Sequence, residues 1–443
     1  MVNIIEFREI PYKPSGYYAL MGILVAAAIA GLVAAGYMAD AGHHVTGMSN
    51  RIVWGMPHVF SVFLILSAAG ALGVASMANV LGRTVYKPLS RLSAVLALAL
   101  LVGGLSVLWL DLGQPGRVPT TLSSLNFSSI FAWNIFVYTG FALAVLASLW
   151  MMIERKMNRY SKPVGLIAFL LSVWLATDVG SVFGVLVARQ AYDTAIMAPL
   201  FVVASLAFGL AVFILVLVPA FTWTGRPLGE FVVRRLGRTL GIVMAIMLYL
   251  VAMQHIVGNY AAERQGVEDF ILSSGGVYTT AFWVLQVAAG SLVPIALIFY
   301  PGTDVWRGRM MLAAALVVLG GLAQLYVIII GAQAYPLVLF PGMETASSFL
   351  DGRIATYTPS PTEIVLGVGG IGLALALVAL AVKVLPVLPM SMADSDVDPH
   401  YRPAEVEEDP PAPAEEADEP EEPDEDMEEV SEGDGDAEES GRT

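Results

Sequence analysis

Ten apolar runs, separated by short polar segments, are the feature that most constrains this 443-residue chain. Each run is about 20 residues long or longer, the length that an α-helix needs to cross the hydrocarbon core of a bilayer. Backbone groups in lipid must be satisfied within the span, so only helices and closed barrels cross membranes, and runs of this length exclude a barrel. We expect helices over residues 17–39, 55–81, 91–112, 127–152, 163–187, 195–221, 239–260, 276–300, 309–333 and 362–386. The sequence therefore predicts an all-α polytopic membrane protein.

Composition supports this fold class and limits the redox chemistry. Charged residues make up 14% of the chain, whereas soluble domains carry roughly a quarter. The chain contains no cysteine, so it cannot bind an iron–sulfur cluster, attach a c-type haem covalently or form a disulfide. Redox work would therefore need a bound organic cofactor, a histidine-ligated haem or a partner protein. We expect no nucleic-acid partner.

Basic residues divide the loops into two sets. One alternating set, which includes the segment before the first helix, is rich in Lys and Arg. The other set has one arginine per loop, namely Arg51, Arg117, Arg189, Arg264 and Arg353. The positive-inside rule places the basic set and both termini in the cytoplasm. We therefore expect a multi-pass protein of the inner (cytoplasmic) membrane and refer to the arginine-poor side as the outer face.

The chain divides into three parts by composition. Residues 1–16 form a short cytoplasmic N-terminus, and residues 17–390 form the membrane domain. Residues 391–443 hold 23 of the 38 acidic residues, and such a segment is expected to be disordered. It is either a solvated tail or a docking arm for a basic partner. The last outer loop, 334–361, is long and rich in aromatic residues, which favours a surface cap or a docking site.

Two carboxylates at the outer side are the main candidates for chemistry. Asp178 falls in the outer third of the fifth helix, where a charge costs a few kcal/mol and must be protonated, paired or hydrated. It is either a satisfied buried carboxyl or a proton acceptor beside a ligand. Asp111 closes the third helix in LDLGQPGR and opposes the helix dipole. With Arg117 it forms either a structural clamp or the rim of an outer-face site.

The histidines of the membrane domain lie near one face. His43 and His44 fall in the first outer loop, while His58 and His255 fall near the outer ends of their helices. A haem chain across the membrane needs ligands near both faces. At most one haem, ligated by His58 and His255, is compatible with this pattern, so we do not expect electrons to cross the bilayer through this chain.

Aromatic and amide residues gather at the same depth. An interfacial aromatic belt accounts for most of them. A quinone ring would use the same residue types, because it needs an apolar slot, donors to two carbonyl oxygens and an acid/base group for two protons. The residues concerned are Trp54, Trp109, Asn126, Trp133, Asn134, Tyr138, Gln254, Asn259, Tyr260 and Tyr335.

LDLGQPGR and the following SLNFSSIFAWNIFVYTGF (124–141) resemble the NrfD/PsrC family, the cofactor-poor polytopic subunits of membrane oxidoreductases. The matching residues are Asp111, Leu112, Gly113, Pro115 and Arg117, then Asn126, Phe127, Ser128, Ser129 and Trp133. The helix WGMPHVFSVFLILSAAGALG (54–73) resembles the first bundle helix of that family. His58 is the candidate for the pocket histidine, although it stands about a turn early, and Ser128–Ser129 replace the usual Ser-Pro.

This resemblance implies two four-helix bundles plus two extra helices. It also implies a quinone pocket at the outer face and electron exchange with a periplasmic ferredoxin-like iron–sulfur subunit, alongside other membrane and cytochrome subunits of a complex. HIVGNYA (255–261) and GAQAYPLVLFPGME (331–344) are similar to the DsrP branch, the quinone-interacting subunit of a sulfite-reductase-linked complex.

The sequence is interpreted as a quinone- or quinol-interacting subunit of a respiratory or sulfur-metabolising complex, using menaquinone or ubiquinone. Asp178 and His58 are the predicted proton-exchanging residues. The predicted cofactor-binding residues are Trp54, Asp111, Arg117, Trp133, Tyr138 and His255, and no metal site is expected. Two alternatives stay open: a passive membrane anchor for a redox partner, and a secondary transporter, although we see no convincing inverted repeat.

Overall fold

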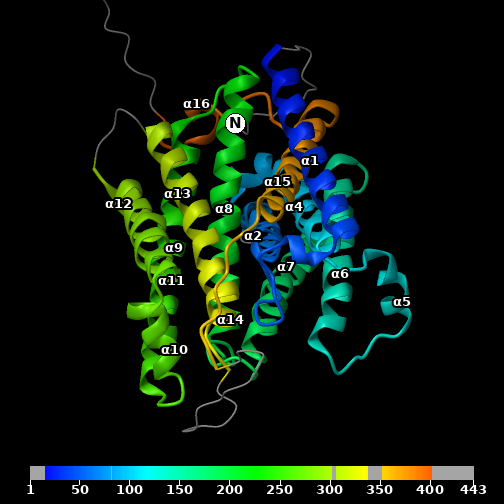
Figure 1. Cartoon of the computed structure of the whole chain (residues 1–443). Coiled ribbons are helices and arrows are strands. Elements are labelled where there is room, and N and C mark those ends of the chain that lie inside the picture. The colour runs from blue at the N-terminus through cyan, green and yellow to red at the C-terminus, as the bar shows by residue number, and fades with distance from the viewer. Residues whose placement is uncertain (1–14, 81, 302–305, 338–351, 402–443) are drawn as a thin grey trace, which may run out of the picture. The chain divides into compact units, whose positions relative to one another are not determined.

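The computed structural model describes residues 15–80, 82–301, 306–337 and 352–401 (Figure 1). In this part of the chain the regular elements are helices, and a single isolated bridge joins Leu228 to Met392. Ten helical spans are long and apolar enough to cross a membrane, which confirms the predicted fold class. They run over Gly16–Ala41, Met56–Asn79, Thr84–Leu110, Ile130–Ile153, Asn158–Gly184, Met197–Trp223, Glu230–Tyr260, Val277–Phe299, Arg307–Ala334 and Pro361–Val384.

Seven of the ten spans are built on one long helix each. These helices are α1 (Ser15–Ala41), α4 (Ser90–Leu110), α6 (Ile130–Ile153), α7 (Ser161–Gly184), α8 (Met197–Trp223), α9 (Glu230–Tyr260) and α15 (Pro361–Val384). The other three change geometry along their length. They consist of α2 (Met56–Ala71) with α3 (Gly73–Asn79), of α11 (Val277–Thr280) with the π-helix η6 (Ala281–Leu292) and α12 (Val293–Phe299), and of α13 (Trp306–Tyr326) with the π-helix η7 (Val327–Gly331) and α14 (Ala332–Ala334).

Helix α9 begins at Glu230, nine residues before the start that the apolar pattern predicts. Its first turns are polar, and they are stabilised by contacts that a hydropathy pattern cannot predict. Glu230 pairs with Arg234 at 2.9 Å one turn on, and the backbone N–H groups of Glu230 and Phe231 donate to the Asp394 carboxylate at 3.1 and 2.9 Å. The described chain thus continues past residue 390 into α16 (Asp394–Val397). Residues 402–443 and the centre of the 334–361 loop lie outside the described residues.

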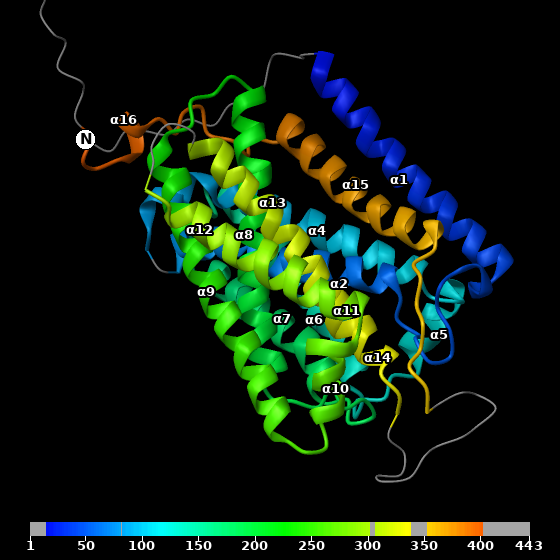
Figure 2. The ribbon, with the colours of Figure 1, turned by 60° about the vertical axis from the view of Figure 1, so that its left-hand side comes forward.

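The helices form two four-helix bundles and a flanking pair, as the resemblance implies. The first bundle contains α2–α3, α4, α6 and α7, and the second contains α8, α9, η6–α12 and α13. Helix α15 packs on α4 and α2, and α1 packs along α15 on the far side, as both views show (Figures 1 and 2). Helix α8 contacts α2, α7, α9 and α13, so it joins the two bundles.

The α2–α8 crossing depends on two glycines. A Cβ atom on Gly70 would lie 1.7 Å from the backbone oxygen of Ser205, and one on Gly209 would lie 2.1 Å from the backbone nitrogen of Ala71. The two backbones therefore touch, which is the packing that small residues allow in membranes. Beside this crossing the rings of Phe63 and Phe208 lie 5.2 Å apart. The join between the bundles is thus a close backbone contact.

The two ends of the molecule carry different loops. Helices α5 (Val118–Ser123), α10 (Gln265–Asp269) and α14 lie at one end, and α16 lies at the other (Figure 1). The first end is the arginine-poor one, which the sequence assigns to the outer face of the membrane. We call it the outer end, and the candidate site residues lie there.

Candidate functional site

Asp178 is a buried carboxyl held between α7 and α6. Its residue is 5% exposed. With its amide nitrogen toward the carboxyl group, Asn134 donates to both oxygens of Asp178, with 3.3 Å between Nδ2 and Oδ1. This amide orientation is assigned from the hydrogen bonds that it satisfies. A carboxyl at this depth is expensive unless it has partners, and Asn134 supplies one from the neighbouring helix.

Tyr138 joins this pair from the same face of α6. It follows Asn134 by four residues, a spacing that places two side chains on one helix face. Tyr138 is partly buried and interacts electrostatically with Asp178. A carboxyl, an amide and a phenol thus meet between α6 and α7. We call Asp178, Asn134 and Tyr138 the acid cluster.

Trp54 and His58 stack at the start of α2. Their ring centroids lie 5.2 Å apart with 8° between the planes. Trp54 also meets Phe183 edge-on at 5.8 Å, and Phe183 lies on α7, about 7.5 Å further along the helix axis than Asp178. The stack therefore packs against the outer end of the helix that carries the acid cluster.

Gln333 fixes the backbone beneath this stack, a role for which the sequence carries no signal. The N–H groups of Val53 and Trp54 donate to Gln333 Oε1 at 2.9 and 3.1 Å, and Gln333 Nε2 donates to the oxygens of Trp54 and Ile329 at 3.0 and 2.8 Å. Arg189 adds a second clamp by donating to Arg51 O at 2.8 Å and to Gln333 O at 3.2 Å. The backbone that carries Trp54 is thus held from the second bundle.

Two predicted binding residues lie apart from this group. Trp133 is 43% exposed, and its indole N–H donates to the backbone oxygen of Phe127 at 3.1 Å. It also packs on Phe136, so it belongs to an aromatic patch on the outside of α6. Arg117 is an exposed residue of the short 3₁₀ segment Pro115–Arg117.

Asp111, just past the end of α4, lies within electrostatic range of a second carboxyl. Glu363 is fully buried near the start of α15 and accepts hydrogen bonds from Gly47 N, Ser360 N and the Tyr357 hydroxyl, at 2.9, 2.7 and 2.8 Å. Burial, and secondly the negative charge of Glu363, raise the pKa of Asp111 to about 7. Asp111 Oδ1 has no hydrogen-bond partner among the described residues. Asp111 is therefore a carboxyl that favours its proton near neutral pH.

This arrangement predicts how stability changes with pH. The pKa of Asp111 is about 7 in the folded chain and about 3.9 when unfolded. The folded state therefore binds more protons in that window, and stability falls as pH rises through it. Asp111→Asn should remove this fall, so its melting temperature should rise relative to wild type between about pH 4 and about pH 7. Tryptophan fluorescence during heating measures the melting temperature at each pH. Asp40→Asn, at an exposed position, is the control and should follow wild type. If the melting temperatures of Asp111→Asn and wild type change in parallel with pH, the assignment is contradicted.

His255 lies in the second bundle, at the outer part of α9. Its Nδ1 is 2.6 Å from Glu268 Oε2, and the two side chains are 12% and 7% exposed. The His255 ring meets Phe282 of η6 edge-on at 4.7 Å. His255 and Asp178 lie at a similar depth along their helices. In the structure, however, Asp178 contacts Asn134 in the first bundle, whereas His255 contacts Glu268 in the second.

The sequence indicates some of the residues that contact the predicted site residues, but not others. Glu363 stands three residues after Ser360, the spacing of a capping box, and both reciprocal bonds of that box are present. Asn134 is recognisable as an amide at the right depth. Glu268 and Gln333 carry no such signal, because one falls in an expected loop and the other is a single amide at the end of an apolar run.

Comparison with known proteins gives a family and several relatives. Residues 44–336 match the family model described as Polysulphide reductase, NrfD. The match includes α2 through α14, and therefore the acid cluster, the Trp54–His58 stack and His255.

Three named relatives are similar over most of the chain. An Hdr-like menaquinol oxidoreductase integral membrane subunit of Archaeoglobus fulgidus is 28% identical, over 82% of this chain and 92% of the relative. A putative membrane subunit of the dimethyl sulfoxide reductase of Halobacterium salinarum is 24% identical, over 79% and 87%. A subunit of the selenate reductase of Mesobacillus selenatarsenatis is 23% identical, over 77% and 88%.

Proposed function

Because the chain belongs to the NrfD family, we propose that it is the quinol-oxidising integral membrane subunit of a multi-subunit redox complex. The similarity to a menaquinol oxidoreductase membrane subunit supports this function and makes menaquinol the proposed substrate. The observation that carries the proposal is the buried Asp178 between Asn134 and Tyr138, at the outer part of the first bundle.

The side chains of this region fit the chemistry of a quinol. A bound quinol supplies two electrons and two protons. The Asp178 carboxyl is a base that can take one of these protons, and the imidazole of His58 is a second acceptor. The Tyr138 hydroxyl is a donor suited to a ring oxygen, the Asn134 amide holds the Asp178 carboxyl, and Trp54 offers an aromatic face. Asp111 and Arg117 would form the rim of the site.

The electrons need an acceptor outside this chain. The chain has no cysteine and thus no ligand of its own for an iron–sulfur cluster. We assign that role to a periplasmic ferredoxin-like iron–sulfur subunit docked at the outer end, within a complex that also holds other membrane and cytochrome subunits. The relatives named as subunits of dimethyl sulfoxide and selenate reductases support membership of such a complex.

We propose the finer assignments on the basis of the sequence. The similarity of residues 255–261 and 331–344 to the DsrP branch favours a complex of sulfur metabolism. The distribution of basic residues favours the inner membrane, with both termini in the cytoplasm and the acid cluster toward the periplasm.

Titration of the purified chain with a fluorescent quinol-site inhibitor tests the proposal, first alone and then with its co-purifying partners. We expect saturable quenching that a menaquinol analogue reverses and that His58→Ala or Asp178→Asn weakens. Trp150→Phe should leave the quenching unchanged, because Trp150 lies near the opposite end of α6 and is 69% exposed. Absence of binding in both preparations would favour the passive anchor, and substrate uptake by the chain alone in liposomes would favour a transporter.

A further inference from the structure

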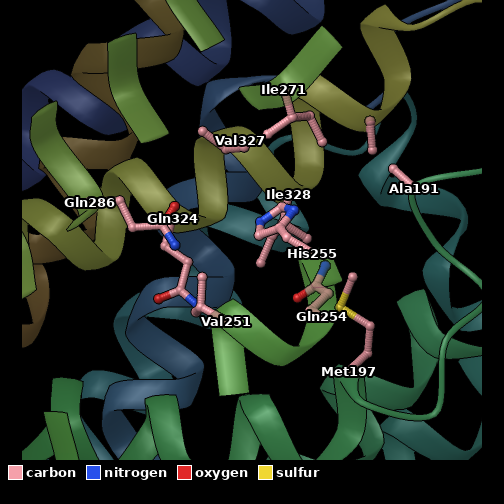
Figure 3. A pocket seen from close by; sticks show the side chains of 11 residues that line it. Ala191, Met197, Val251, Gln254, His255, Ile271, Gln286, Gln324, Val327 and Ile328 are labelled. Atoms are coloured by element: carbon pink, nitrogen blue, oxygen red, sulfur yellow. The ribbon is translucent and has the colours of Figure 1, made fainter. Parts of the chain in front are cut away.

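The outer half of the second bundle encloses a small polar cavity that the quinol proposal does not use (Figure 3). Its polar side chains come from three helices: Gln254 and His255 from α9, Gln286 from η6 and Gln324 from α13. The apolar lining residues are Ala191, Met197, Val251, Ile271, Val327, Ile328 and Ala332. The free volume is about 20 Å³, which is enough for a water molecule and far too small for a quinone ring.

Gln324 has an unused hydrogen-bond acceptor at this cavity. The residue is 1% exposed, and its Oε1 atom has no hydrogen-bond partner within the described ranges. An amide oxygen that leaves water and gains no partner destabilises the fold. Gln324 lines the cavity together with Gln286 (Figure 3). A water molecule in the cavity would supply the missing donor, since buried waters typically bind several otherwise unsatisfied polar groups.

The His255–Glu268 pair gives the same cavity an acid–base group. Glu268 engages Nδ1 of the ring at 2.6 Å, so Nε2 is the nitrogen left for another partner. With one proton between Nδ1 and Oε2, the pair carries a net negative charge in a low-dielectric interior. A second proton can bind at Nε2, which Glu268 does not occupy. His255 lies in the cavity wall, so water there can deliver and accept that proton.

The helices around the cavity depart from regular α geometry. Residues Phe270–Ser274, Ala281–Leu292 and Val327–Gly331 form π-helical segments, and each contributes a lining residue, namely Ile271, Gln286 and Val327–Ile328. Such segments are rare and occur frequently at functional sites. The cavity thus lies where three segments of the second bundle depart from α geometry, and η6 also brings the polar Gln286 into its wall.

We propose that the second bundle contains a buried water site that exchanges protons with the His255–Glu268 pair. One proton arrives through the cavity water and binds His255 Nε2, and the same proton leaves to that water; no electron is transferred and no covalent bond other than N–H changes. Gln324 and Gln286 orient the water. The site is separate from the acid cluster and does not depend on the quinol assignment.

Hydroxyl-radical footprinting in ¹⁸O-labelled water tests whether water occupies the cavity, because the radicals form where water molecules are. The buried Met197 lines the cavity, whereas the buried Met244 and Met247 of α9 do not. In the full-length protein within its complex, we expect Met197 to gain ¹⁸O several-fold faster than both control methionines. Equal rates at the three residues would overturn the proposal without any variant being made.

Two variants then identify the groups that hold the water. Gln324→Leu should slow Met197 labelling to the rate of the control methionines. Ser67→Ala is the matched control, because Ser67 also has a buried oxygen without a partner in the described chain but lies on α2, outside the cavity. It should leave Met197 labelling unchanged. A dry cavity in wild type, or equal effects of both variants, contradicts the water site.

Deuterium exchange at the Cε1 atom of histidine tests proton exchange, because it proceeds only when the ring takes up and releases protons in contact with water. We expect His255 to exchange in D₂O although its side chain is 12% exposed, and to exchange more slowly in Gln324→Leu. The more accessible His44 is the positive control. If His255 has not exchanged when His44 has exchanged fully, the acid–base role is refuted. The footprinting result would then still support the water site alone.

Discussion

Replacing Asp178 by asparagine is expected to lower quinol-linked turnover of the assembled complex by about 100-fold or more, the contribution of a positioned acid–base group. Asparagine preserves the shape of the side chain but cannot accept a proton. It also loses one favourable contact, since Asn134 donates to both oxygens of the native carboxyl. The loss should therefore appear mainly in turnover number, with a smaller change in inhibitor affinity. Steady-state assays with a soluble menaquinol analogue measure both.

A matched variant separates proton transfer from a general effect of lost charge. Glu263→Gln makes the same carboxyl-to-amide change at an exposed position of the outer end and should leave turnover unchanged. Wild-type turnover in a correctly assembled Asp178→Asn complex would show that Asp178 is a structural carboxyl. Equal losses in both variants would point to an electrostatic effect on partner docking.

Substituting Gly209 by leucine is expected to abolish the folded membrane domain. A Cβ atom at this position would lie 2.1 Å from Ala71 N and 2.3 Å from the Gly70 carbonyl carbon, so even one carbon collides with backbone. Extra atoms in a packed core typically cost roughly 1–3 kcal/mol, and more where backbones must separate. Because α8 joins the two bundles, we expect them to separate from each other when the α2–α8 contact is lost. Size-exclusion chromatography and thermal unfolding in detergent measure the loss.

The same crossing offers an internal control. A Cβ atom on Gly73 would meet only Leu206 Cδ2, at 3.5 Å, which is an ordinary contact. Gly73→Ala should therefore yield a monodisperse protein with a melting temperature near that of wild type. Folded, stable Gly209→Leu would mean that the α2–α8 contact is not the join that holds the bundles together.

The spans and their composition are readable from the sequence because each is a local property. Ten runs of sufficient length predict ten helices, and the structure has them. The predicted start of α9 is wrong because its first turns are polar and are held by Asp394, a residue 164 positions away from Glu230. Hydropathy also cannot predict the π-helices η6 and η7, because an apolar run has the same hydropathy in an α-helix and in a π-helix.

The candidate site is only partly visible from the sequence. Asp178, Tyr138 and Asn134 share a depth, and the structure brings them together between α6 and α7. His255 shares that depth too, yet it pairs with Glu268 in the other bundle. Glu268 falls in an expected outer loop, and its burial arises because α10 packs against the end of α9, where Glu268 meets His255.

The sequence by itself determined the number of spans, the arginine-poor end and the depth of each polar residue, because hydropathy and a fixed rise per residue act along one dimension. Only the tertiary structure decided which polar side chains interact: Asp178 hydrogen-bonds Asn134, His255 contacts Glu268, and Asp111 lies within electrostatic range of Glu363. Those pairings depend on how each helix is rotated about its axis. That rotation is set by packing between segments far apart in the chain, such as the backbone contact of Gly70 with α8, and no local pattern encodes it.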